Sequence, residues 1–272
     1  MTAVDTKLRT LVMAVLNITP DSFADGGRHF SYADALIRGK AMISEGADII
    51  DVGGESTRPG AQRIPIEEEL NRVIPIITEL SGLGAVISID TMRSEVATAA
   101  ISAGATYVND VSGGLADPKM SGVLANSPHI QFIAMHWRAH SAQMQNFTRY
   151  KDVVTDVKNE LEARVENLIK AGLIPEQIII DPGIGFAKES HHNWEILRNI
   201  DRFQLIGFPV LVGASRKRFL GEVTGATSPD DREAASIAIT TEMARMGVWG
   251  VRTHGVRAHR DAITVIQELR GI

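Results

Sequence analysis

Polar and charged side chains recur at the ends of short apolar runs along this 272-residue sequence. Such groups cost free energy inside an apolar strand unless they are hydrogen-bonded or bind a ligand. A single one can be structural, but a set that occurs at the end of every run favours one shared site. The set is Asn17, Asp51 with Glu55, Asp90, Asn109 with Asp110, His136, Asp181, Ser215 with Lys217, and Arg252 with His254.

Three members of this set are rich in hydrogen-bond acceptors and suit a ligand that presents a row of N–H donors. They are Asp90, Asn109 and Asp181. A carboxylate accepts two parallel N–H bonds from an amidine-like edge, as it does from arginine. Two facing carboxylates repel each other, so a donor-bearing ligand or a cation must lie between them. Lys217 is the candidate for that cation.

Cations form the second chemical group, which consists of Arg58, Lys217, Arg252 and His254. The run Ser215-Arg216-Lys217-Arg218 places positive charge where a helical segment begins, although a helix N-terminus favours anions. A solvated basic turn would explain the run without a ligand. An anionic ligand would remove the electrostatic conflict, and we favour that interpretation. The segment 51–60 combines glycines, hydroxyls and Arg58, and suits closure over such an anion.

Motifs for a nucleotide or a zinc site are missing from the sequence. It has neither G-x-G-x-x-G nor a phosphate loop of the G-x-x-x-x-G-K-[ST] type, and it has no H-E-x-x-H. A hard divalent ion shared with the phosphates of a ligand needs few protein ligands, so we predict Mg²⁺ at the side-chain oxygen of Asn17. His136 is either a pocket wall or a satisfied core group.

Eight apolar runs of strand length alternate with segments of helical period, and these elements must bring the polar set together. The runs are rich in Val and Ile, as expected for parallel strands covered on both faces. The pattern predicts an α/β fold, a single (β/α)₈ TIM barrel over residues 1–272 with its core at about 11–270, and a site at the C-terminal strand ends. An open doubly wound sheet is the alternative. The expected strands are Leu11–Asn17, Asp48–Gly54, Ala85–Thr91, Thr106–Ser112, Gln131–Trp137, Gln177–Gly183, Pro209–Ser215 and Trp249–His254.

Several helical segments end in a glycine, and long loops follow many of the strands. Gly46, Gly104, Gly172 and Gly247 are predicted C-caps. The expected helices are Tyr32–Gly46, Glu67–Ser81, Ser94–Gly104, Lys119–Asn126, Val153–Gly172, Asn193–Phe203, Arg232–Gly247 and Val256–Arg270. Long loops in compact domains tend to be functional. Here they are Ile18–Ser31, Glu55–Pro65, Arg138–Asp152, Ile184–His192 and Arg216–Asp231.

Composition narrows the class of protein further. A net charge of −5 gives no general attraction to nucleic acid or to an anionic membrane, so local cations must hold any anionic ligand. The absence of cysteine excludes disulfides, thiolate metal ligands and a cysteine nucleophile. The first residues are charged and lack the apolar run of a signal or membrane segment. We therefore expect a cytoplasmic protein with small-molecule substrates and no nucleic-acid or membrane partner.

Taken together, the motifs resemble dihydropteroate synthase, the pterin-binding enzyme family of folate biosynthesis, from about Leu11 to the last helix. One departure is Gly255, where the family often has Asp, and this bears on the positioning of the residues before it. The matching stretches are Leu16–Phe23, Asp51–Ala61, Ser88–Thr91, Val108–Val111, Met135-His136, Asp181–Phe186, Ser215–Lys217 and Arg252–His254.

The resemblance implies that 4-aminobenzoate is joined to 6-hydroxymethyl-7,8-dihydropterin diphosphate with release of diphosphate, with Mg²⁺ as cofactor and sulfonamides as competitors. It also implies a homodimer, formed through late helices such as Arg232–Gly247. The implied pterin-binding residues are Asp90, Asn109, Asp181, Phe186 and Lys217. The implied diphosphate and Mg²⁺ residues are Asn17, Arg252 and His254. Those implied for 4-aminobenzoate are Phe23, Thr57, Arg58, Pro59 and Ser215. The residues implied in catalysis are Asp90, Asp181, Lys217, Arg252 and His254.

Two other functions stay open on the sequence alone. A related pterin barrel passes a methyl group from a folate to a corrinoid protein, but it would not need Arg58 or the S-R-K and R-x-H cations. A pterin-binding paralogue without turnover would not need the intact segments Thr19–Phe23 and Ser56–Gly60. Both features favour the synthase.

Overall fold

A computed structural model describes residues 9–19, 32–56, 63–140 and 144–271. Phe23, Thr57, Arg58 and Pro59 of the predicted 4-aminobenzoate site lie outside the described residues. The other predicted site residues lie within them.

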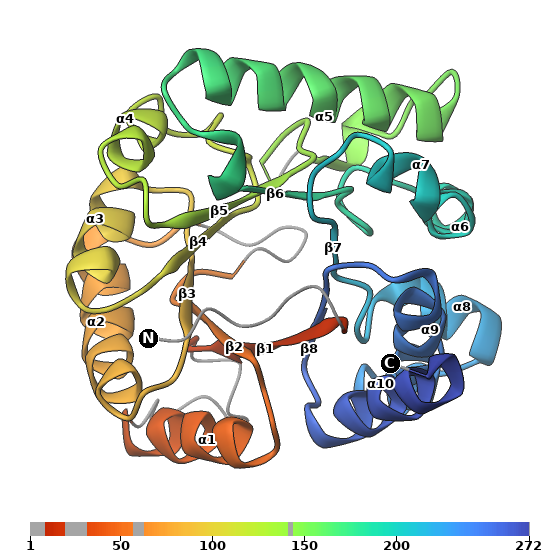
Figure 1. The fold of residues 1–272 in the computed structure, drawn as a ribbon, viewed down its shortest axis with the longest axis horizontal. Coiled ribbons are helices and arrows are strands. Elements are labelled where there is room, and N and C mark those ends of the chain that lie inside the picture. The colour runs from red at the N-terminus through yellow and green to blue at the C-terminus, as the bar shows by residue number, and fades with distance from the viewer. Residues whose placement is uncertain (1–8, 20–31, 57–62, 141–143, 272) are drawn as a thin grey trace.

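Eight parallel strands form one sheet that curls into a barrel surrounded by helices (Figure 1). Along the sheet their order is β6-β5-β4-β3-β2-β1-β8-β7, and a parallel bridge between Ile180 and Val210 joins β6 to β7. The predicted (β/α)₈ barrel is therefore confirmed, and each strand lies within its predicted range. The strands are β1 Leu11–Asn17, β2 Ile49–Gly53, β3 Ile87–Asp90, β4 Tyr107–Asp110, β5 Gln131–Met135, β6 Ile178–Asp181, β7 Leu211–Val212 and β8 Gly250–Thr253.

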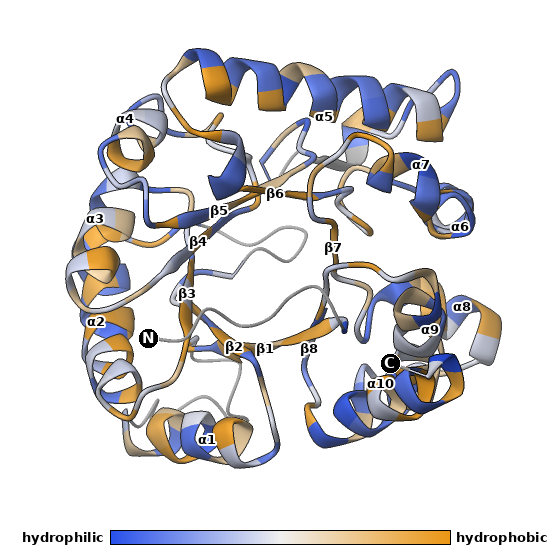
Figure 2. Cartoon of the chain, in the orientation of Figure 1, coloured by the Kyte–Doolittle hydropathy of each residue, from blue (hydrophilic) through white to orange (hydrophobic). Residues whose placement is uncertain are grey.

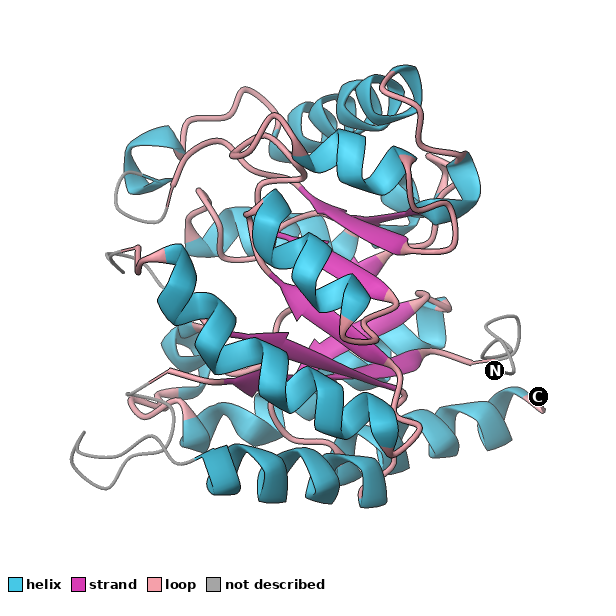
Figure 3. Ribbon diagram, turned by 90° about the vertical axis from the view of Figure 1, so that its left-hand side faces the viewer, coloured by secondary structure: helices cyan, strands magenta, loops and turns pink. Residues whose placement is uncertain are grey.

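Helices form the outer layer around the strands when the barrel is seen from the side (Figure 3). Within the described ranges, none of them is both long and apolar enough to cross a membrane. The α-helices are α1 Tyr32–Ser44, α2 Ile66–Gly82, α3 Ser94–Ser102, α4 Met120–Ala125, α5 Val153–Lys170, α6 Ser190–Arg198, α7 Ile200–Gln204, α8 Arg218–Thr224, α9 Glu233–Met246 and α10 Arg257–Arg270. The 3₁₀ turns are η1 Met144–Phe147, η2 Pro175–Gln177 and η3 Asp230–Arg232.

Two helical segments differ from the prediction. The range Asn193–Phe203, expected as one helix, forms α6 and α7, because Asn199 leaves the helical conformation and its Nδ2 donates to Glu195 O at 2.8 Å. The range 216–231, expected as a loop, contains α8. This short helix is stabilised by tertiary packing, since the Phe219 ring meets the ring of Trp194 on α6 edge-on at 4.9 Å.

Alternate residues of each strand face two different cores. On β1 and β6, Met13 and Ile179 pack inside the barrel, whereas their neighbours Val12 and Ile180 pack against the helices. On β3 the numbering is reversed, so that Ile89 packs outward and Asp90 faces inward. Both faces are apolar, so the sequence reads as continuous runs and β1, β2 and β6 appear hydrophobic in Figure 2. Further along each strand the inward positions become polar, as from Ile179 to Asp181. The layering therefore turns the polar strand ends toward one another.

Candidate active site

Arg252 on β8 draws the ends of three other strands together at the mouth of the barrel. Its Nε donates to Asp51 Oδ2 on β2, and its Nη2 donates to Asp90 Oδ2 on β3, both at 2.6 Å. Asn109 on β4 donates through Nδ2 to the same Asp51 oxygen at 2.9 Å. Asp51, Asp90 and Asn109 are all buried, so the four residues form one desolvated cluster.

Lys217 and Asp181 form a second wall of the same mouth. Lys217 follows β7, donates through Nζ to Ile184 O, and its Nζ lies 4.8 Å from the centroid of the Phe186 ring. Asp181, at the end of β6, is buried, and its Oδ1 accepts a hydrogen bond from Gly183 N at 2.7 Å. The β6–α6 loop thus fixes both charged groups.

Gly213 lies where the two walls meet. A Cβ at this position would lie 3.8 Å from Arg252 Cβ and 3.9 Å from both Asp181 Oδ2 and Lys217 Nζ. The prediction that Asp90, Asp181, Lys217 and Arg252 share one mouth agrees with this geometry. Lys217 was predicted as the cation between the two carboxylates. In the structure each carboxylate has its own cation: Lys217 is the main charge beside Asp181, and Arg252 is bonded to Asp90.

Burial shifts the ionisation of the charged groups in this mouth. Desolvation raises the pKa of Asp90 to about 7, although Arg252 opposes the shift. Burial also raises the pKa of Asp181, and here Lys217 is the main opposing charge. Desolvation lowers the pKa of Lys217 to about 8 despite the proximity of Asp181. The mouth thus contains three buried carboxylates, those of Asp51, Asp90 and Asp181, but within the described part of the chain only the two cations Arg252 and Lys217. This leaves carboxylate oxygens free to accept hydrogen bonds from a ligand.

An apolar wall borders the charged groups, and the sequence prediction missed most of it. Met92, Val111 and Met135 form a buried cluster, and Phe186 packs against it. Met92 and Val111 follow the ends of β3 and β4, and Met135 ends β5. Such a surface suits the face of a flat heterocycle whose edge bonds to the carboxylates. The inward alternation at the end of β5 is the signal that would have identified Met135.

Asp51 was also missed, because the sequence prediction assigned it to the strand-end set without a role. It joins Arg252 to Asn109 through Oδ2, while its Oδ1 has no hydrogen-bond partner among the described residues. The buried Ser88 Oγ, on the residue paired with Asp51 across β2 and β3, is equally unpartnered in that part of the chain. The polar cluster therefore extends one layer below the mouth.

Three other strand-end residues bond to the protein itself. Asp110 accepts from Ser112 N at 2.7 Å and shapes the loop after β4. Glu55 accepts from Arg93 Nη2 at 2.9 Å. His136 is a satisfied core group, since its Nε2 donates to Glu160 Oε2 at 2.8 Å. These residues position loops rather than face the mouth.

Lys188 is a buried cation that the sequence prediction did not single out. Its Nζ donates to His136 Nδ1, Gly183 O and Phe186 O, each at 3.0 Å. Burial lowers the pKa of Lys188 to about 7. Its three bonds tie β5 to the loop that carries Phe186 and therefore hold one wall of the mouth.

The basic run after β7 divides into one inward cation and two outward ones. Only Lys217 reaches the mouth. Arg216 pairs with Asp230 Oδ1 at 2.5 Å, and Arg218 pairs with Glu222 Oε1 at 3.1 Å on the exposed side of α8. The prediction that the whole run binds an anion is therefore wrong for Arg216 and Arg218.

Ser215 and His254 lie together at the ends of β7 and β8. Ser215 Oγ is 3.1 Å from His254 Nδ1 and accepts from His254 N at 3.2 Å. The pair adjoins Lys217 and Arg252 in sequence, so the predicted cationic residues occupy adjacent strand ends.

Asn17 at the end of β1 lies on the Asp90 side of the mouth. A Cβ on Gly53 would be 3.4 Å from Asn17 Oδ1 and 3.7 Å from Asp90 Oδ2, so only this glycine separates them. A partly exposed carboxamide oxygen beside a carboxylate is a hard-oxygen donor set of the kind that Mg²⁺ prefers. These residues fit a metal that takes most of its ligands from phosphates and water.

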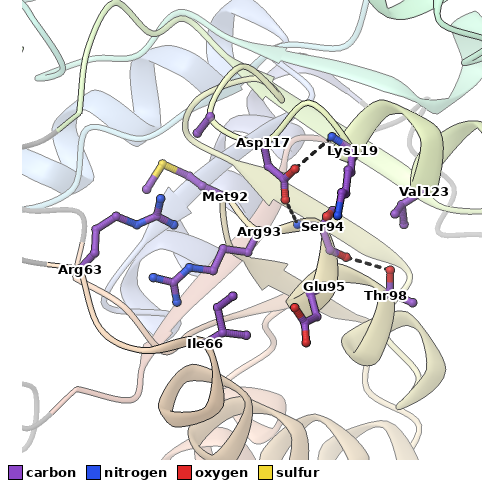
Figure 4. A pocket seen from close by; sticks show the side chains of 11 residues that line it. Arg63, Ile66, Met92, Arg93, Ser94, Glu95, Thr98, Asp117, Lys119 and Val123 are labelled. Atoms are coloured by element: carbon purple, nitrogen blue, oxygen red, sulfur yellow. Dashed lines mark hydrogen bonds between the residues drawn. The ribbon is translucent and has the colours of Figure 1, made fainter.

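A cavity of about 590 Å³ lies beside the mouth, between the loops that follow β3 and β4 (Figure 4). Met92 lines it and also belongs to the apolar wall. The polar groups that line the cavity are largely hydrogen-bonded within the protein. For example, Asp117 accepts from Ser94 N at 2.8 Å and from Lys119 N at 2.9 Å. We place the active site at the strand ends because the buried, incompletely paired charges gather there.

The chain matches the family described as "Pterin binding enzyme" over residues 13–254. It is 47% identical over 261 residues to a dihydropteroate synthase of Mycobacterium leprae, which covers 94% of this chain and 92% of the relative. The match spans the strands and the loops that carry the mouth. The chain therefore belongs to the pterin-binding enzyme family.

Solved structures narrow the assignment within that family. Dihydropteroate synthase of Xanthomonas albilineans with 4-aminobenzoic acid has a TM-score of 0.91 and 40% identity, covering 97% of this chain and 94% of that one. The same enzyme in complex with 7,8-dihydropteroate has a TM-score of 0.88 and 36% identity, covering 99% and 96%. This chain is thus an enzyme of the dihydropteroate synthase kind, a transferase.

Proposed function

We propose that this enzyme condenses 6-hydroxymethyl-7,8-dihydropterin diphosphate with 4-aminobenzoate, giving 7,8-dihydropteroate and diphosphate. The observation that carries the proposal is the single mouth in which Asp90, Asn109 and Asp181 face the same space as Lys217 and Arg252. One related structure contains 4-aminobenzoic acid and another contains 7,8-dihydropteroate, which supports the choice of substrates.

The acceptor residues bind the pterin in this proposal. Its 2-amino group and ring N–H groups donate to the carboxylates of Asp90 and Asp181, and Asn109 contributes a carboxamide. The apolar wall of Met92, Val111, Met135 and Phe186 covers a face of the ring. The charge of Lys217 opposes the effect of burial on the Asp181 pKa and so favours the ionised carboxylate, which accepts hydrogen bonds.

The reaction is a substitution at the pterin methylene. The amine nitrogen of 4-aminobenzoate forms the new C–N bond, the C–O bond to diphosphate breaks, and the amine releases a proton. Arg252 and His254 stabilise the charge that gathers on the departing diphosphate. The electron-rich dihydropterin stabilises positive charge on the methylene, so no protein nucleophile is required.

Mg²⁺ would be held by Asn17 together with the diphosphate, where it would supply Lewis-acid stabilisation of the leaving group. Ser215 lies close enough to His254 to contact the second substrate or the diphosphate beside it. Phe23, Thr57, Arg58 and Pro59 are proposed to complete the 4-aminobenzoate site, where positioning of the amine supplies much of the rate. We also propose a cytoplasmic homodimer.

One assay separates this function from pterin binding without turnover. Purified protein with both substrates and Mg²⁺ should release diphosphate only when 4-aminobenzoate is present, and a sulfonamide should compete with that acid. Release that ignores the acid would refute the condensation. Pterin binding without any release would identify a non-catalytic paralogue.

A further inference from the structure

Gly255, the residue after His254, leaves room for a carboxylate from another element. A Cβ built on Gly255 would lie 2.1 Å from Glu233 Oε1, much closer than van der Waals contact. The backbone of Gly255 is not in the left-handed region, so its conformation does not require glycine. The glycine is therefore needed for space, and Glu233 at the start of α9 fills that space.

Glu233 uses both of its oxygens in this position. Oε1 accepts from Nε2 of His259 on α10 at 3.2 Å, and Oε2 accepts from Arg216 Nε at 2.8 Å. His259 is fully buried and is fixed at its other ring nitrogen by Thr240 Oγ1 at 2.8 Å. The carboxylate is consequently held on a rigid support where α8, α9 and α10 lie together (Figure 1).

Arg216 is the residue on which this support acts. It lies between Ser215 and Lys217 and has a left-handed backbone, with φ of 58°, which a side chain other than glycine rarely adopts. Such a conformation persists only when its surroundings over-determine it.

The surroundings of Arg216 meet that requirement, and α9 with its preceding turn supplies them all. Arg216 N donates to Ser236 Oγ at 2.9 Å, and Arg216 O accepts from Arg232 Nη1 at 3.1 Å. The guanidinium bonds to Glu233 and to Asp230. This residue reverses the chain so that its neighbour Lys217 enters the mouth while Arg216 itself points outward.

We infer that Glu233 is a positioning residue of the active site: through Arg216 it holds the turn that presents Lys217, and Gly255 is the complementary space. This inference rests on the proposed function, because Lys217 is given a role in pterin binding there. Positions 233 and 255 are then coupled, because the space between them holds the carboxylate of one side chain but not of two.

The pair predicts a rescue. Glu233→Ala removes the acceptor of Arg216 Nε, leaving only the exposed Asp230 on the guanidinium, and should lower kcat/KM for the pterin diphosphate about tenfold to a hundredfold, the scale expected when a reacting group is misplaced. Gly255→Asp should cause a similar loss, because its side chain displaces Glu233 and places two negative charges together. The double variant E233A/G255D supplies one carboxylate from the opposite side and should recover most of the activity.

Glu242 provides the matched control on the same helix, since it makes an exposed pair with Arg245 at 2.6 Å. Glu242→Ala should leave kcat/KM within about twofold of the wild type. Failure of the double variant to exceed either single variant would overturn the inference, as would unchanged kinetics in Glu233→Ala.

Hydrogen exchange gives a readout that does not depend on turnover. The amide of Arg216 should exchange faster in Glu233→Ala and return toward the wild-type rate in E233A/G255D. If the wild type shows no synthase activity, the proposed function fails while this measurement still tests the pair. Equal exchange in all variants would refute the positioning role even in an active enzyme.

Discussion

Replacing Asp51 tests whether the layer below the mouth holds Arg252 in place. Its Oδ2 accepts from both Arg252 Nε and Asn109 Nδ2, and its Oδ1 has no partner within the described residues. Asparagine can place its carbonyl oxygen at the Oδ2 position and keep both bonds. Alanine keeps neither, so the two substitutions should differ sharply.

The magnitudes follow from these bonds. In Asp51→Ala, the buried Asn109 donor loses its partner, at about 1–3 kcal/mol, and Arg252 loses one of two carboxylates, at about 1.5–3 kcal/mol. The sum of about 4 kcal/mol agrees with the roughly 3–5 kcal/mol expected when a buried ion pair is broken. Asp51→Asn keeps both accepted bonds and loses the charge assistance of the Arg252 bond, about 1 kcal/mol, while its amide nitrogen replaces Oδ1, which has no partner among the described residues.

Calorimetric melting and the diphosphate-release assay measure the two consequences. Asp51→Ala should lower Tm by roughly 10 °C and reduce kcat/KM strongly, because Arg252 is released toward Asp90 alone. Asp51→Asn should lose only a few degrees and stay within about tenfold of wild-type activity. If the two variants had the same Tm, or if alanine cost less than about 1 kcal/mol, the assigned bonds would be incorrect.

Four further predictions concern single side chains. Asp181→Asn should weaken calorimetric binding of 6-hydroxymethyl-7,8-dihydropterin, because the amide puts a donor where an acceptor is needed; unchanged affinity would contradict this role. Lys217→Ala should impair turnover. Because burial lowers the pKa of Lys217 to about 8, kcat/KM of the wild type should decline above pH 8, where the ammonium loses its proton. A flat profile well beyond that pH would argue against a charged Lys217. Lys188→Met should raise KM for the pterin substrate about tenfold, because the loop that carries Phe186 loses its bonds to Lys188. The control Lys170→Met, at an exposed position, should leave KM unchanged, and equal KM values in the two variants would reject the role of Lys188 in holding the loop. Chelating Mg²⁺ and Asn17→Ala should each slow diphosphate release without adding to one another, and additive losses would place the ion elsewhere.

The repeated alternation of apolar runs with helical periods was sufficient to predict the barrel and the position of its mouth. Parallel strands place their carboxyl ends together, so a polar residue at each end was enough to predict a shared site. Asp90, Asp181, Lys217 and Arg252 meet there as that reasoning requires.

The details that depend on packing were not accessible to the same reasoning. The run over Arg218–Thr224 contains a glycine and β-branched residues, and its helix is supported by tertiary contacts such as that of Phe219 with Trp194. Nothing local indicates that Arg252 bonds to Asp51, which is distant in the sequence. The basic run around Lys217 looks uniform in sequence, yet the left-handed backbone of Arg216 sends neighbouring side chains to opposite sides.

The join between β6 and β7 has fewer paired residues than the other strand pairs of the barrel. These strands meet at one bridge, Ile180 to Val210, with a bond from Ile180 N to Pro209 O at 2.9 Å, whereas β5 and β6 pair over four residues. Regions with few backbone bonds open at a lower free energy than the whole fold. The seam separates Asp181 from the turn of Lys217, and it is otherwise crossed by side-chain contacts such as Phe219 on Trp194. We therefore expect gentle heating to open the substrate pocket, and to stop catalysis, before the other strand pairs separate.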